Sequence, residues 1–283
     1  MHWSRRYDAI SYYYIILSYS FAPIGTKSQY YPLSPPQKLN KDGKDINDDH
    51  PNFDPYALPI QTIEDYWNVI GRLESAKGNK KQYADIVQET GVSSLSTCSA
   101  SPAFSHPFFS PLDPFHLFYE NCMPHLWDIW VSYSSESEIV HMPKNIASAL
   151  GEVAESATAT LPLSFSGPIQ DPSKKQESSY KIYEWMALLH WYIVPIAWEL
   201  GFNREVVKNF AIFSNVVEYA MTAIPPTQKD LITLYAKIVD FLQGFEHIYV
   251  GNIFKIPHCR LCLFQLIFVP FHIPYHGSKV SKP

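Results

Sequence analysis

Apolar residues recur at spacings of three and four through most of the chain, and this periodicity constrains the fold more than any other feature. In the first such segment Ile63, Trp67, Ile70 and Leu73 fall on one face of a helix that begins near Thr62. Helical patterns continue in five later segments, at residues 80–90, 142–156, 179–200, 203–224 and 227–249. Only short pieces of the chain favour a strand. The sequence therefore predicts a mainly α fold.

Residue types that begin and end helices mark several of these boundaries. Thr62, Asn203 and Thr227 precede helical patterns and supply the side-chain oxygens that favour an N-cap. Gly91 follows the segment at 80–90 and indicates its end. Pro195 lies inside a long apolar segment, where it removes a backbone donor and predicts a kink.

The N-terminal part of the chain contrasts with this helical region. Prolines, glycine and acidic residues crowd between residues 23 and 60, and no helical or strand period is present there. Such a segment buries too little apolar surface to order itself. We expect a poorly ordered N-terminal segment and linker at residues 1–60, a helical region at 61–277 and a tail at 278–283.

The charge balance favours no nucleic-acid surface by itself. The 283 residues include 27 acidic and 22 basic side chains, with a formal net charge of -5 and an isoelectric point near 6.1. Nucleic-acid binding domains usually carry a basic face or a high isoelectric point. Any role at DNA would therefore need a local basic patch or a partner.

Cysteine usage and hydropathy indicate an intracellular protein without a membrane partner. Four cysteines in a chain of this length do not make a disulfide scaffold. Residues 1–22 resemble a weak signal peptide, but Asp8 interrupts the apolar run and tyrosine and serine dilute it. No segment reaches the roughly 18 uninterrupted apolar residues that predict a membrane-spanning helix.

The densest group of chemically active side chains follows residue 112. Asp113 precedes Pro114, and His116 and Glu120 follow at spacings that place them on one helix face. Such a cluster can hold a divalent metal ion, orient a general base or tie down a loop. The spacing alone favours a simpler role, with Asp113 as the N-cap of a helix whose first residue is Pro114. Surface pairing of His116 with Glu120 is an equal alternative.

A second group of candidate ligands lies near the C-terminus. Cys259, Cys262, His272 and His276 form the pattern C-x2-C-x9-H-x3-H, and thiolates and imidazoles are the usual ligands of zinc. The central gap is shorter than in zinc fingers and holds an apolar, core-like run. Buried free cysteines are the favoured interpretation, and zinc the alternative.

Residues 109–130, "FSPLDPFHLFYENCMPHLWDIW", resemble a characteristic stretch of Tnp2-type transposases of the CACTA (En/Spm) class, fungal versions in particular. Weaker resemblances follow the order of that family: "SQYYPLSPP", "YALPIQTIEDYW" and "ETGVSSLS" before this stretch, and "YKIYEWMALLHWYIVP" and "GFEHIYVGNIFKIPHCRLCLFQLIFVPFHI" after it. The resemblance covers about residues 29–277.

The resemblance implies a DNA transposition function in the nucleus. Catalytic domains of that family resemble an RNase H-like fold in which three acids bind two Mg2+ or Mn2+ ions, and the ions activate the attacking oxygen. Families of this kind also carry an acid-x-x-His element, which Asp113 and His116 match. The resemblance thus implies catalytic roles for Asp113 and His116, with Glu120 beside them, and metal binding for Asp113.

Departures from the family pattern imply an incomplete site. The residues before Tyr30 do not match the segment that holds the first catalytic aspartates in the family, and Phe264 and Phe268 replace two of its histidines. We therefore expect an internal transposase fragment, mainly α with at most a remnant edge of an RNase H-like α/β core. We expect no bound Mg2+ or Mn2+ in this chain.

Two alternatives remain from the sequence. The first is a helical module without enzymatic activity that binds another protein through an exposed apolar surface. The second, more distant one is a zinc hydrolase that uses Cys259, Cys262 and His272. The chain contains no Gly-rich phosphate loop, no G-x-S-x-G and no H-E-x-x-H, so the familiar enzyme signatures are absent.

Overall fold

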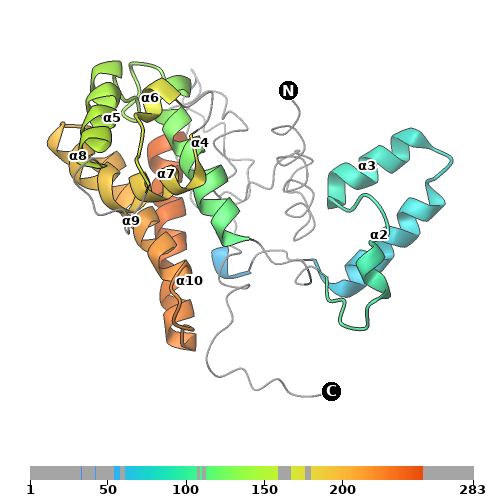
Figure 1. Cartoon of the computed structure of the whole chain (residues 1–283). Coiled ribbons are helices and arrows are strands. Elements are labelled where there is room, and N and C mark those ends of the chain that lie inside the picture. Colours follow the sequence, from blue (N-terminus) through green and yellow to red (C-terminus); the bar gives the residue numbers. More distant parts are fainter. Residues whose placement is uncertain are drawn as a thin grey trace. The chain divides into compact units, whose positions relative to one another are not determined.

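The structure is a computed structural model, and it describes residues 33, 42, 54–57, 61–106, 109, 113–158, 167–175 and 180–250. These residues are mainly helical and form no sheet, which confirms the expected mainly α class (Figure 1). The expected remnant of an RNase H-like sheet edge is therefore not found among them. Most of the predicted linker at 1–60 and all of the predicted tail lie outside the described residues.

The chain divides into two compact units, and the described helices of the first lie within His50–Leu112. This unit contains a 3-10 turn at Pro55–Ala57, the helices α2 (Ile63–Ser75) and α3 (Lys80–Thr90), and a second 3-10 turn at Thr97–Ala100. Figure 1 shows α2 and α3 as a pair joined by a short turn.

Local capping explains the ends of both helices. The Thr62 hydroxyl accepts a hydrogen bond from the Asp65 amide, and the Asp65 carboxylate accepts one from the Thr62 amide, at 3.2 and 2.8 Å. This reciprocal pair satisfies two amides that the first turn leaves without helical partners. Gly91 ends α3 with a φ of 73°, a left-handed conformation that favours glycine. The predicted boundaries at Thr62 and Gly91 are confirmed.

The predicted apolar face of α2 is wrong at one position. Trp67 is 46% exposed, whereas its neighbour Tyr66 is 3% exposed and packs with Ile70 and Leu73. The buried face of α2 therefore includes Tyr66 in place of Trp67. The Tyr66 hydroxyl also accepts a hydrogen bond from the Ser96 amide at 2.9 Å, which gives its polar end a partner.

The helices that the structure describes in the second unit lie within Asp113–Arg260. Its α-helices are α4 (Met123–Asp128), α5 (Lys144–Thr158), α6 (Pro172–Lys175), α7 (Ile182–Ala187), α8 (Ile193–Glu199), α9 (Arg204–Ala220) and α10 (Gln228–Phe245). Asn203 caps α9, and Thr227 caps α10 together with Asp230, as the sequence predicts. A short loop joins α9 to α10, and the two helices pack along each other (Figure 1).

Among the described residues of this unit, four further segments are π-helical: η4 (His116–Cys122), η5 (Ile129–Tyr133), η6 (Leu188–Tyr192) and η7 (Glu246–Val250). They extend or interrupt α4, α7, α8 and α10, so each of these helices changes its winding once or twice. π turns are rare in proteins and often occur near functional sites. Pro195 was expected to kink its helix, and η6 interrupts that helix just before the proline.

The core of the second unit is rich in aromatic side chains. Trp127, Trp130, Leu126 and Ile129 are at most 1% exposed, which confirms their predicted place in the core. Phe245 and Tyr249 stack with ring centroids 4.3 Å apart. Offset aromatic pairs of this kind stabilise a core beyond the area that they bury. Within the described residues, no helix is long and apolar enough to cross a membrane.

Candidate functional site

Asp113 is the N-cap of the helix that carries the predicted site. One carboxylate oxygen, Oδ1, accepts hydrogen bonds from the amides of Phe115 and His116, at 2.9 and 3.3 Å. These amides belong to the first helical turn, which has no helical acceptor for them. The predicted cap is therefore confirmed. It fixes the carboxylate against the backbone instead of leaving it on a mobile side chain.

The imidazole of His116 lies between two carboxylates. Its Nδ1 is 2.6 Å from Oδ2 of Asp113, and its Nε2 is 3.4 Å from Oε2 of Glu120. The structure thus brings together the three side chains that the sequence grouped. Asp113 and Glu120 are each 47% exposed and His116 is 41% exposed, so the group lies at the surface of its unit.

The pKa of Asp113 reflects competing effects. Partial burial raises it, but the hydrogen bonds from the His116 side chain and amide, the His116 charge and the Phe115 amide together lower it below its ordinary value. Hydrogen bonds to a carboxylate favour its charged form. Asp113 is therefore an anion across the physiological range, as a metal ligand or a partner of an imidazole must be.

Asp113, His116 and Glu120 are not arranged as a three-ligand metal site, and the metal-binding role that the resemblance implies for Asp113 stays a prediction. Asp113 and Glu120 face opposite nitrogens of one imidazole ring, so their carboxylates do not converge on a common point. Two-metal chemistry requires several carboxylates around ions about 4 Å apart. In the part of the chain that the structure describes, no group of three or more histidine, cysteine, aspartate or glutamate side chains is arranged to hold a metal ion.

A second series of polar contacts, which sequence reasoning missed, links the same helical segment to η6 and α9. Tyr119 follows His116 on the π turn η4, and its hydroxyl lies 2.8 Å from Nε2 of His190 on η6. Nδ1 of His190 lies 3.8 Å from Oε1 of Glu218 on α9. Burial raises the pKa of Tyr119 to about 12, assisted by the Glu218 charge. The tyrosine is therefore neutral and donates or accepts a hydrogen bond.

Another contact joins the remaining two π turns. Nε1 of Trp130 on η5 donates a hydrogen bond to the Tyr249 hydroxyl on η7 at 2.9 Å. The four π turns therefore contact each other in two pairs, η4 with η6 and η5 with η7. A hydrogen bond that involves a tyrosine hydroxyl joins each pair. Both pairs involve the continuous helical segment that begins at Asp113. They hold its position against elements that lie far away in sequence.

The other predicted ligands separate into two groups. Cys259, Cys262, His272 and His276 lie outside the described residues, so the zinc alternative remains a prediction. The sequence offers Glu246 both as a further candidate acid for the site and as an ordinary helix-surface acid. Its side chain is fully buried, so the surface interpretation is wrong. It follows the buried Leu242 by four residues and Phe245 by one, which places it on the apolar face of α10 and η7.

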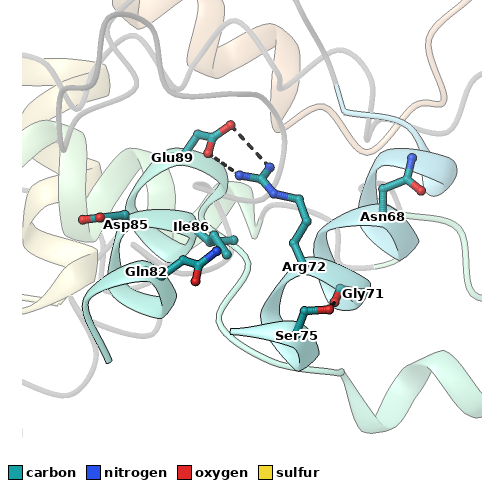
Figure 2. Close-up of a pocket in the computed structure, with 8 residues that line it drawn as sticks. All are labelled: Asn68, Gly71, Arg72, Ser75, Gln82, Asp85, Ile86 and Glu89. Atoms are coloured by element: carbon teal, nitrogen blue, oxygen red, sulfur yellow. Dashed lines mark hydrogen bonds and ion pairs between the residues drawn. The ribbon is translucent and has the colours of Figure 1, made fainter. Parts of the chain in front are cut away.

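The first unit carries a separate hollow between its two helices. A cavity of about 660 Å³ opens between α2 and α3, and Figure 2 shows Arg72 reaching across it to Glu89. The guanidinium lies 2.6 and 3.4 Å from the two carboxylate oxygens. Because the cation is already paired and both groups are about half exposed, this groove presents no excess positive charge for a phosphate.

The chain was compared with protein families, curated proteins and solved structures. No family model, no curated protein and no solved structure matches this chain significantly. The resemblance to CACTA-class transposases therefore depends on the motifs of the sequence alone.

We expect Asp113→Ala to destabilise the second unit by about 1 kcal/mol, the usual effect of a lost N-cap. Asp113→Asn keeps an oxygen acceptor at the cap and should restore most of the loss. Urea unfolding followed by circular dichroism measures both variants. Equal stability of Asp113→Ala and the wild-type protein would show that the cap contributes nothing to the fold.

Proposed function

We propose that this chain derives from a CACTA-class transposase and carries an incomplete copy of its catalytic machinery. The observation that supports this most is the contact between Asp113 and His116 at 2.6 Å, at an exposed helix start. These are the acid and histidine of the motif on which the resemblance depends.

The arrangement suits a supporting role in phosphoryl-transfer chemistry. A carboxylate fixed by two amides loses little conformational entropy when it binds a cation or receives a proton. An imidazole held by that carboxylate is oriented for proton transfer or hydrogen bonding. In the intact family, Mg2+ or Mn2+ would supply the activation of the attacking oxygen, with Asp113 among its ligands. DNA is the partner and the nucleus the compartment that this origin implies.

The proposal includes the loss of independent activity. The nearest acid to Asp113 within the motif is Glu120, and it faces the other side of the imidazole ring. The formal charge of -5 also provides no general attraction for the phosphates of DNA. Both observations favour a chain that retains the fold of the motif without the metal cage of the working enzyme.

We therefore expect the purified chain not to cleave DNA in the presence of Mg2+ or Mn2+. Its DNA binding should be weak and should vanish near physiological salt, because few phosphate contacts are available. Incubation with supercoiled and transposon-end DNA, followed by gel electrophoresis, tests this expectation. Nicking that disappears in Asp113→Ala would instead show that the chain keeps a working site.

The transposon origin has a separate test in the genome. Terminal inverted repeats around the gene, together with upstream aspartates in the same reading frame, would support the proposed origin. Flanking DNA that lacks both features, in every strain sequenced, would contradict it. This test does not depend on the activity of the purified chain.

A helical protein-interaction module is the second candidate function. Large apolar side chains are exposed on both units, with Trp67 at 46% in the first and Trp191, Ile224 and Ile232 at 42, 76 and 65% in the second. Isolated exposed apolar residues are ordinary on protein surfaces. Ile224 favours an interaction role more specifically, because it lines a defined hollow.

A further inference from the structure

A hollow of about 310 Å³ lies where the loop at residues 221–227 joins α9 to α10. Its lining includes Glu218, Tyr219, Ile224, Pro225, Pro226 and Asp230. The volume is at the lower end of the range for pockets that hold small ligands. It is large enough for one long side chain and too small for a folded partner element.

The walls of this hollow are apolar, exposed and stiff. Ile224 is 76% exposed and Tyr219 is 37% exposed, so neither is used to build the core. Pro225 and Pro226 fix two consecutive φ angles, which reduces the freedom that the loop would lose on binding. A preorganised apolar wall at the surface favours binding because less conformational freedom is lost when a ligand is ordered on it.

The lining of the hollow includes two carboxylates, Glu218 and Asp230. Glu218 is 59% exposed, and its Oε1 lies 3.8 Å from Nδ1 of His190. Asp230 uses Oδ2 to accept hydrogen bonds from the Thr227 amide and hydroxyl, while Oδ1 takes no part in this cap. The hydrogen bonds from the Thr227 hydroxyl and amide lower the pKa of Asp230, and the charge of Lys229, which does not line the hollow, adds to this effect. The site therefore carries negative charge next to an apolar wall.

We propose that this hollow binds a lysine or arginine side chain presented by an extended segment of a partner protein. The cationic end lies between Glu218 and Asp230, and its methylene stem and the adjacent apolar residue lie on Ile224 and Pro225. Long basic side chains combine these two properties, an apolar stem and a charged end. Nucleic acid is the disfavoured occupant because its phosphates would face two carboxylates. The proposal does not depend on the transposase origin.

Binding at Glu218 has a consequence inside the unit. The same carboxylate faces His190, which in turn contacts Tyr119 on the π turn of the Asp113 motif. A cationic ligand competes with His190 for Glu218. Occupancy of the hollow should therefore change the environment of the His190 ring, although that ring does not line the hollow.

The test uses the full chain and the peptide acetyl-Leu-Lys-Leu-amide, with binding followed by calorimetry and by the histidine ring signals in NMR. We expect the same peptide with norleucine in place of lysine to bind at least about tenfold more weakly, since it loses a charge-assisted contact. Glu218→Gln should weaken binding of the lysine peptide by about the same factor. The matched variant Asp240→Asn, at an exposed acid of α10 outside the hollow, should leave it unchanged.

Three results would overturn the proposal. Equal affinity for the lysine and norleucine peptides would show that the hollow recognises apolar groups only. No binding at millimolar peptide would show that it is not a peptide site. A dimer of the chain that Ile224→Ser dissociates would show that a second copy occupies this face. Movement of the His190 ring signals on addition of the lysine peptide, absent in Glu218→Gln, would support the proposed competition.

Discussion

Acidification from about pH 6.5 to pH 4 is expected to lower the free energy of unfolding of the second unit by about 3 kcal/mol through His125 alone. This residue lies on α4, where burial lowers its pKa from 6.5 to about 4. The unfolded chain binds a proton at His125 below pH 6.5, whereas the folded chain does so only near pH 4. The stability is therefore complete above the higher value and is lost as the pH falls between the two.

The measurement compares urea unfolding of the wild-type protein and His125→Gln at several pH values from 7.5 to 4. The difference between the two proteins isolates His125, because other groups that titrate in this range are common to both. Among these is His190, whose pKa burial also lowers although Glu218 opposes the shift. A constant difference in stability at every pH would contradict the assignment. A variant that is relatively more stable at pH 4 than at pH 7.5 agrees with it.

Features controlled by neighbouring residues could be predicted from the sequence. The cap at Asp113 depends on amides two and three residues away, and the caps at Thr62 and Thr227 each depend on an acid three residues away. Such contacts form within one turn and need no knowledge of the tertiary fold. The same argument explains why the cluster of Asp113, His116 and Glu120 was predictable, since one helical turn brings the three together.

Features that depend on distant elements could not be predicted. The contact between Tyr119 and His190 joins residues 71 apart, and that between Trp130 and Tyr249 joins residues 119 apart. The periodicity of an apolar segment does not distinguish an α turn from a π turn, because one inserted residue shifts the face by less than the width of the apolar stripe. The position of Trp67 shows the same limit, since Tyr66 beside it competes for the same face.

The burial of Glu246 was in principle within reach of the sequence. Its spacing of four from Leu242 places it on the apolar face of α10, which a strict count of the helical period would show. Its charge favoured a surface position, whereas its helical spacing favoured a buried one. Buried carboxylates are uncommon. At Glu246 the helical period therefore predicted burial better than the residue type did.

A tight contact between α9 and α10 leads to the last prediction, that Gly244→Ala lowers the free energy of unfolding of the second unit by about 2 kcal/mol. A Cβ atom at this position would lie 2.5 Å from Nδ2 of Asn209, well inside contact distance. Asn209 is buried on α9, and its Nδ2 donates a hydrogen bond to the Phe241 carbonyl at 3.0 Å. The added methyl group must displace this amide or separate the helices, and either change outweighs the better helix propensity of alanine.

Gly71→Ala in α2 is the matched control for this substitution. It also places a Cβ in a helix interior, but nothing lies within 4 Å of that position. Alanine should therefore stabilise the first unit by about 0.5–1 kcal/mol through helix propensity. Chemical unfolding of both variants separates the steric effect from the propensity effect.

The double variant Gly244→Ala, Asn209→Ala should lose less stability than the sum of the two single changes, because the clash requires both side chains. Additive losses would contradict the proposed contact and would assign the effect of Gly244→Ala to another part of the α9–α10 interface.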